Sequence, residues 1–368
     1  MRGIKTAIGI MAIGLFSAST PAAAGWTVPQ EASTGNLAQP SMVADSDGAQ
    51  YVVARGDTGL WFVTNKGGSW VRTRMTQDYD TNVNGAQTHH VAVHPQVAIN
   101  AGGTLTVVYA VNVFSGSTGG SCQSAALRYT VRSGSSWTKP KSIPDTACET
   151  ATGIVAHGAK IYLATFNSPD PSVRQVLYLT NASGSWTHAS VANGKPNHIF
   201  QASLSTYDGK PMLAYVKSGH LIYARGLTSI GNFIHETAAT TDSSATSEPS
   251  VAINPKNDWP MIAWTQSDGT HYGYRNANGW YSSRVMRGTG RALLAFDEGG
   301  IPHVATADGA GGLWYGWSYG GSWHSFHLDV HTVTDLGGLG TAVGGAQISY
   351  IRGTTHLYDV LYFEDHGC

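Results

Sequence analysis

The chain has 368 residues, of which 12% are charged, 10% are aromatic and 45 are glycine, and its formal net charge is -1. This aromatic content and the near-zero net charge exclude an intrinsically disordered chain. Because 22 Lys and Arg residues are balanced by 23 Asp and Glu residues, no basic surface that would bind nucleic acid phosphates is expected.

Residues 1–24 have the pattern of a secretory signal peptide. Arg2 and Lys5 precede an apolar stretch over residues 6–17, and three alanines follow at 22–24. The apolar stretch is shorter than the ~20 residues that a membrane-spanning helix needs. We therefore expect cleavage after Ala24, a single domain over residues 25–368, secretion to the extracellular space and no membrane partner.

Secretion would place the three cysteines in an oxidising environment. Cys122 and Cys148 lie in the same repeat unit, which contains the longest insertion of the chain. We expect a disulfide between these two residues. Cys368, the third cysteine, is then left without a partner in the chain.

A unit of four strand-length runs recurs along the chain. It is clearest over residues 249–285, where PSVAIN, WPMIAW, THYGYR and GWYSSRV follow one another and are separated by Asn, Asp, Gly or Pro. Such a unit predicts a four-stranded antiparallel sheet. No window of about twelve residues has uninterrupted helical periodicity. Similar units cover residues 40–75, 95–137, 154–191, 199–237 and 292–326.

The last unit, which includes residues 347–363, lacks its fourth run. The missing run occurs at residues 25–28 as GWTV, which matches the SWT at 136–138 and 185–187. With that run included, the fourth-run aromatic residue occurs seven times, at positions 26, 70, 137, 186, 233, 280 and 323. We predict an all-β, seven-bladed β-propeller whose last blade is closed by the N-terminal strand.

These motifs resemble those of the secreted sialidase-like, or BNR-like, propellers. The resemblance rests on the PSVAI run, the Asp-Gly turns, strands that end in Tyr and the Gly-Ser-Trp motif, and it extends over nearly all of residues 25–368. No Asp box is intact, since SDGT at 267–270 and SDG at 46–48 are fragments that also suit hairpin turns. The sialidase arginine motif is not found, so the resemblance implies the architecture without assigning sialidase activity to particular residues.

Polar residues open the first strand of every predicted blade. In a propeller these strands surround the axis, so their opening residues should converge at one mouth of the channel. The residues at these positions are Gln39, His94, Glu149, His198, Gln201, Glu248, Arg291 and Asp335.

Two catalytic chemistries fit this set. Glu149 and Glu248 could be the acid and the base of a glycoside hydrolase. His94 and His198 would instead suit a polysaccharide lyase, in which Arg291 binds an acidic sugar and a base removes the adjacent proton.

Further residues are candidates for binding the substrate. Tyr79 could donate a proton or bind sugar, Trp317 lies in a Gly-rich hairpin and could stack on a sugar ring, and Gln39 and Gln201 could bind hydroxyl groups. The histidines at 89, 90 and 94 do not predict a metal site, because adjacent residues of a strand point to opposite faces. We predict no metal and no cofactor.

The sequence therefore predicts a secreted, monomeric, carbohydrate-active propeller with one axial pocket, whose partner is a glycan or polysaccharide. A lectin or a protein-interaction propeller without catalysis is the alternative, in which the polar residues only line a water-filled channel. A multivalent lectin usually repeats one binding motif in each blade, whereas here the opening residue differs from blade to blade. This difference favours one composite site.

Overall fold

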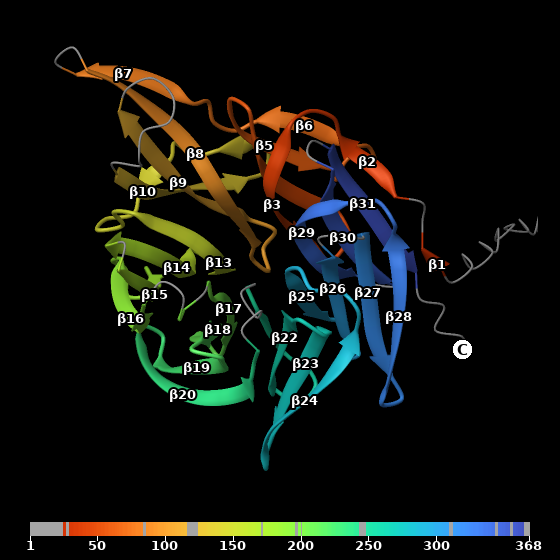
Figure 1. Ribbon diagram of the computed structural model, residues 1–368. Helices are drawn as coiled ribbons and strands as arrows, with labels where there is room; N and C mark the ends of the chain where they lie inside the picture. Colours follow the sequence, from red (N-terminus) through yellow and green to blue (C-terminus); the bar gives the residue numbers. More distant parts are fainter. Residues whose placement is uncertain are drawn as a thin grey trace, which may run out of the picture.

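Every regular element that the structure describes is a β-strand (Figure 1). The computed structural model describes residues 25–363, except 27–28, 84–85, 116–123, 171, 196–197, 200, 243–247, 309–311, 343–344 and 354–355. The predicted signal peptide, Cys122 and Cys368 lie outside the described residues. No helix long and apolar enough to span a membrane occurs in the described part.

The strands form seven antiparallel sheets arranged around a common axis, which confirms the predicted seven-bladed propeller. The first blade consists of β3 (Leu37–Ala44), β4 (Gln50–Gly56), β5 (Gly59–Thr64) and β6 (Val71–Arg74). The second consists of β8 (Ala86–Ile99), β9 (Leu105–Ser115), β10 (Ser124–Ser133) and β11 (Ser136–Trp137), with β7 (Tyr79–Val83) and β12 (Lys141–Ser142) added. The third consists of β13 (Glu149–His157), β14 (Lys160–Asp170), β15 (Val173–Thr180) and β16 (Thr187–Gly194).

The remaining four blades complete the ring. The fourth blade consists of β17 (Ser203–Tyr207), β18 (Lys210–Lys217), β19 (His220–Thr228) and β20 (Gly231–Thr240), and the fifth of β21 (Ser250–Ile253), β22 (Pro260–Gln266), β23 (Gly269–Asn276) and β24 (Gly279–Met286). The sixth consists of β25 (Ala292–Phe296), β26 (Pro302–Asp308), β27 (Gly312–Tyr319) and β28 (Ser322–Asp329). The seventh consists of β29 (Val333–Ala342), β30 (Gly345–Arg352) and β31 (His356–Phe363), together with β1 (Gly25–Trp26) and β2 (Gln30–Ser33).

The N-terminal segment closes the seventh blade, as predicted. Both β1 and β2 pair antiparallel with β31, with Gly25 opposite Phe363 and Gln30 opposite Asp359. Figure 1 shows the first and last strands of the chain side by side. Without this segment, β31 would be an unpaired sheet edge.

The recurring aromatic residue of the fourth strand is a contact between blades. In five of the seven blades it packs edge-on against an aromatic residue of the third strand of the preceding blade, with ring centroids 5.0 to 5.7 Å apart. Because the contact recurs from blade to blade, the aromatic residue recurs in the sequence with the period of the blades. The pairs are Phe62–Trp137, Tyr129–Trp186, Tyr178–Phe233, Tyr223–Trp280 and Tyr272–Trp323.

The apolar core is divided among the junctions between blades. Seven clusters of buried residues are described, and each combines residues of two neighbouring blades. Tyr178 of the third blade and Leu213 of the fourth, for example, belong to one cluster and are fully buried. The ring is thus stabilised by contacts between residues that are distant in sequence.

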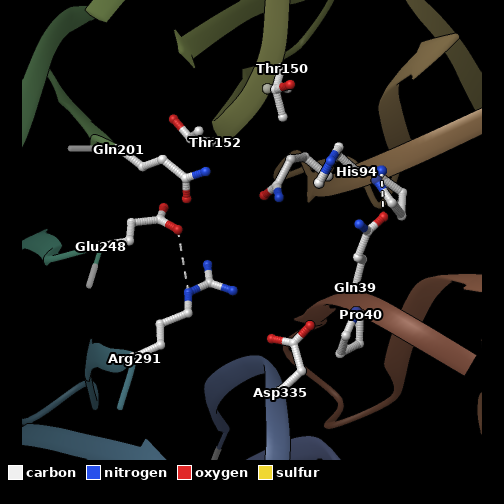
Figure 2. Close-up of a pocket in the computed structure, with 12 residues that line it drawn as sticks. Gln39, Pro40, His94, Thr150, Thr152, Gln201, Glu248, Arg291 and Asp335 are labelled. Atoms are coloured by element: carbon white, nitrogen blue, oxygen red, sulfur yellow. Dashed lines mark hydrogen bonds and ion pairs between the residues drawn. The ribbon is translucent and has the colours of Figure 1, made fainter. Parts of the chain in front are cut away.

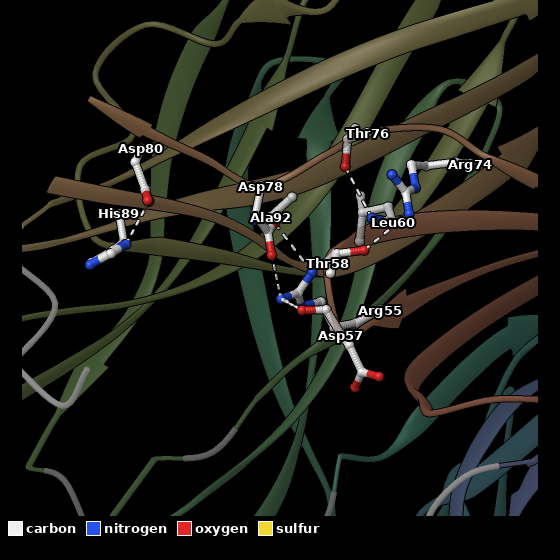
Figure 3. Close-up of polar contacts among 10 residues, drawn as sticks. All are labelled: Arg55, Asp57, Thr58, Leu60, Arg74, Thr76, Asp78, Asp80, His89 and Ala92. Carbon is white, nitrogen blue, oxygen red and sulfur yellow. Dashed lines mark hydrogen bonds and ion pairs between the residues drawn. The ribbon is translucent and has the colours of Figure 1, made fainter. Parts of the chain in front are cut away.

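An additional hairpin of the second blade, formed by β7 and the first half of β8, protrudes from the ring (Figure 1). Its base is tied to the first blade by Asp78 (Figure 3). The Asp78 carboxylate accepts hydrogen bonds from the Arg55 guanidinium at 2.6 Å and from the N–H of Ala92 at 3.1 Å. These bonds hold the part of β8 that leads into the axis.

Cys148 is a free cysteine with an exposed side chain, and the structure shows no disulfide at this residue. The expected partner, Cys122, lies outside the described residues. The Cys122–Cys148 disulfide therefore stays a prediction.

Candidate functional site

Polar residues that precede the first strands, or that lie at register shifts within them, meet around the axis. They surround a cavity of about 230 Å³, named here the axial pocket (Figure 2). All seven blades contribute side chains to it. The residues that line it are Gln39, Pro40, His94, Pro95, Gln96, Thr150, Ala151, Thr152, Gln201, Glu248, Arg291 and Asp335.

Serine hydroxyls next to the axial pocket hold neighbouring first strands in register. Each accepts a hydrogen bond from a backbone N–H of the next blade at 3.0 Å. These contacts align three of the seven pairs of neighbouring first strands. The donor and acceptor pairs are Val97 and Ser41, Val251 and Ser203, and Leu294 and Ser250.

The backbone is strained at two neighbouring positions of the pocket wall. Gln39 and His94 have φ angles of 51° and 50°, in the left-handed region that residues other than glycine rarely adopt. Both positions lie in register shifts of their strands, where an extra residue redirects side chains. The N–H of His94 donates to the Gln39 side-chain oxygen at 2.9 Å, which couples the two positions.

Arg291 lies between two carboxyl groups (Figure 2). Its Nε is 3.5 Å from Oε2 of Glu248, and its Nη1 donates to the carbonyl oxygen of Leu336 at 3.1 Å. Burial raises the pKa of Glu248 to about 7, although the Arg291 charge lowers it, and the Asp335 charge adds to the increase. Glu248 can therefore carry a proton near neutral pH.

Asp335 and His94 complete the titratable set of the pocket. Burial raises the pKa of Asp335, whereas the Arg291 charge and hydrogen bonds from the backbone N–H groups of Leu336 and Gln39 lower it. Burial lowers the pKa of His94 below its ordinary value of 6.5, so its imidazole is neutral at pH 7. The pocket thus combines two different carboxyl groups, one guanidinium and a neutral imidazole.

The structure does not bring Glu149 to the axial pocket. Its side chain is buried, and its carboxylate accepts a hydrogen bond from the Thr165 hydroxyl at 2.7 Å. Burial raises its pKa to about 7. The adjacent Thr150 and the bulged Thr152 face the pocket instead, and the second carboxyl group beside Glu248 is Asp335. Sequence reasoning placed Asp335 at the mouth without assigning it a catalytic role.

Three other candidates lie outside the axial pocket. His198 is exposed, and its Nδ1 is 3.3 Å from the Ser218 hydroxyl. Tyr79 lies on the protruding hairpin, 43% exposed, and stacks on His90 with centroids 4.4 Å apart. Trp317 stacks on other aromatic rings of the sixth blade. Among the described residues, no group of three or more His, Cys, Asp or Glu side chains could hold a metal ion.

Glu149→Gln is expected to increase the free energy of unfolding at about pH 8 by about 3 kcal/mol. A carboxyl group with a pKa of about 7 when folded and 4.5 when unfolded destabilises the folded state once it ionises, by about 1.4 kcal/mol per pKa unit. Glutamine keeps an acceptor for Thr165. Because the carboxyl is protonated in both states at low pH, the gain should disappear at about pH 4.

Urea unfolding at the two pH values measures this difference. An equal change at both pH values, or a loss of stability at the higher one, would contradict the assignment of Glu149 as a buried carboxyl group with a raised pKa.

No protein-family model and no curated protein sequence matches the chain. Solved structures do. The sialidase of Trypanosoma rangeli aligns with a TM-score of 0.55 at 11% identity, over 91% of this chain and 57% of that one. The same enzyme in complex with sialic acid aligns with a TM-score of 0.53 at 10% identity, over 91% and 56%.

An ulvan lyase, described as a new family of polysaccharide lyase, aligns with a TM-score of 0.57 at 11% identity, over 91% of this chain and 95% of that one. This chain thus spans little more than half the length of the trypanosome sialidases but nearly all of the lyase. It has the sialidase-like β-propeller fold, as the sequence motifs predict.

Proposed function

We propose that the protein is a secreted glycoside hydrolase that binds a sugar unit of an extracellular glycan in the axial pocket. The observation that carries the proposal is the arrangement of Glu248 and Asp335 around Arg291. Two carboxyl groups with different environments are what general acid catalysis and its complementary base or nucleophile require.

The environments assign the roles. Glu248, whose pKa is raised to about 7, donates a proton to the glycosidic oxygen. Asp335, whose pKa is raised by burial and lowered by the neighbouring Arg291 charge, activates water or attacks the sugar in its ionised form. His94 is neutral, and with Gln39 and Gln201 it supplies hydrogen bonds for sugar hydroxyl groups.

The charge of the pocket favours hydrolysis over elimination. A lyase must neutralise the acidic group of its substrate, but the Arg291 guanidinium is already opposed by Asp335 and, whenever it is ionised, by Glu248. The described pocket lining contains no other Arg or Lys. An uncharged sugar unit therefore fits better than a uronate.

The fold neighbours support a carbohydrate ligand. The matched structures are those of sialidases, one of them in complex with sialic acid, and of an ulvan lyase. In this chain the corresponding ligand would be a glycan. The protein would act as a monomer, because one chain supplies all the residues that line the axial pocket.

The test is a depolymerisation screen of the mature protein against neutral and acidic polysaccharides. New reducing ends without ultraviolet absorbance from an unsaturated sugar would support hydrolysis, and NMR of the first product would assign its anomeric configuration. An unsaturated product would overturn the proposal in favour of a lyase. Glycan binding without any product would overturn it in favour of a lectin.

The pH profile provides a further prediction. Hydrolysis should decline as the pH rises through about 7, because Glu248 then loses the proton that it donates. Arg291→Gln removes a positive charge that lowers the pKa values of Glu248 and Asp335. In the Arg291→Gln variant, the acidic limb and the basic limb of the plot of kcat against pH should therefore both move to higher pH.

Arg291→Lys is the matched control, since it keeps the charge and should keep both limbs near those of the wild type. A basic limb that moves to lower pH in Arg291→Gln would contradict the assignment of Glu248 as the acid.

A further inference from the structure

A second cavity, of about 290 Å³, lies at the junction of the fourth and fifth blades. We name it the blade 4–5 pocket. It is separate from the axial pocket, because Gln201 precedes β17 whereas Tyr207 ends it, a span of roughly 20 Å of extended chain. The lining residues are Tyr207, Met212, Tyr223, Arg225, Glu236, Asn257, Asp258, Trp259, Pro260 and Arg275.

Two aromatic side chains form part of the wall. Tyr207 is 40% exposed and makes a side-chain hydrogen bond with Asp258. Trp259 is half-buried, and the Arg275 guanidinium lies 5.5 Å from its ring centroid. Aromatic rings that are partly exposed and held by polar neighbours provide flat apolar surfaces beside hydrogen-bonding groups.

The charged groups of the wall are fixed across the blade junction. The Glu236 carboxylate of β20 accepts hydrogen bonds from Arg275 Nε of β23 at 2.7 Å and from Trp280 Nε1 of β24 at 3.1 Å. These contacts hold Glu236 and Arg275 in place before any ligand binds. Arg225 differs from them, since no described residue accepts a hydrogen bond from its exposed guanidinium. It is a donor available to a ligand.

The charges of this pocket balance. Arg225 and Arg275 are matched by Glu236 and Asp258, so neither an anion nor a cation would be attracted strongly. Planar donors and acceptors around an aromatic surface suit a ring that carries hydroxyl groups on its edge and C–H groups on its faces. We propose that the blade 4–5 pocket binds an uncharged pyranose unit of a glycan, without cleaving it.

Binding is tested by saturation-transfer NMR and titration of the Glu248→Gln protein with methyl glycosides of neutral hexoses and of glucuronic acid. The Glu248→Gln background prevents turnover. At least one neutral glycoside should still bind when Gln201→Ala is added to weaken binding at the axial pocket, and in that protein both Trp259→Ala and Arg225→Gln should weaken the binding tenfold or more. Arg225→Gln changes an exposed side chain, so it tests the site if Trp259→Ala does not fold. Trp317→Ala, an aromatic change outside both cavities, is the control and should leave affinity unchanged.

Variants of the axial pocket separate this proposal from the proposed hydrolase. In Gln201→Ala with Glu248→Gln, binding at the blade 4–5 pocket should persist even if the axial pocket has no catalytic role. The proposal would be overturned if no neutral glycoside binds, if glucuronide binds more tightly than all neutral glycosides, or if Gln201→Ala abolishes binding while Arg225→Gln and Trp259→Ala leave it unchanged.

Discussion

Glu248→Gln is expected to lower kcat for glycan hydrolysis by roughly 10²- to 10⁴-fold, the usual contribution of a general acid. The amide cannot donate the proton that a carboxyl group with a pKa of about 7 supplies near neutral pH. Glutamine keeps the size and hydrogen-bonding capacity of the side chain, so affinity for the glycan should change little. Steady-state kinetics and equilibrium titration measure the two quantities.

The chain contains a matched control for this substitution. Glu149 is also buried, and its pKa is also raised to about 7, but it lies outside the axial pocket. Glu149→Gln should therefore keep kcat near the wild-type value, whereas Asp335→Asn should lose activity as Glu248→Gln does. A full loss of activity in Glu149→Gln, together with an active Glu248→Gln, would reverse the assignment of the catalytic carboxyl.

Deletion of residues 25–33 is expected to lower the free energy of unfolding by on the order of 5 kcal/mol. The deletion removes β1 and β2, so β31 loses its ladder partners along both segments. It also removes Ala32, which is buried in a cluster with Leu37 and Leu357. Urea unfolding of the truncated protein measures the loss.

Gln30→Ala is the control for this deletion, because the side chain is exposed and the strand remains. It should change stability by no more than about 0.5 kcal/mol. A truncated protein as stable as the Gln30→Ala variant would contradict closure of the ring by the N-terminal segment.

The candidate site was predictable where a proline follows the residue that faces the axis. Gln39, His94 and Glu248 each precede a proline; Glu248 lies just before β21, whereas Gln39 and His94 lie at register shifts inside β3 and β8. The third blade has no proline there, and β13 contains a register shift between Ala151 and Gly153. Register shifts also occur in β3 and β8, so the difference in the third blade is the missing proline, without which sequence reasoning selected Glu149 instead of the adjacent threonine.

Other candidates depended on packing that sequence does not describe. Trp317 lies in a Gly-rich hairpin, as expected, but its ring is stacked on Phe326 of the adjacent strand. Tyr79 belongs to an additional strand, β7, which extends the second blade beyond the four-stranded repeat. A repeat pattern predicts only the features that all blades share, whereas the stacking of Trp317 and the additional strand β7 each belong to a single blade.

The sequence by itself determined the fold class, the number of blades and the closure of the ring. These follow from strand periodicity and from one recurring aromatic residue per blade, and both are local or strictly repeated. Only the tertiary structure decided which polar residues face the axis together, and that Glu248, Arg291 and Asp335 form one charged group. The physical reason is that burial and charge–charge interactions depend on distances between blades, which no local pattern encodes.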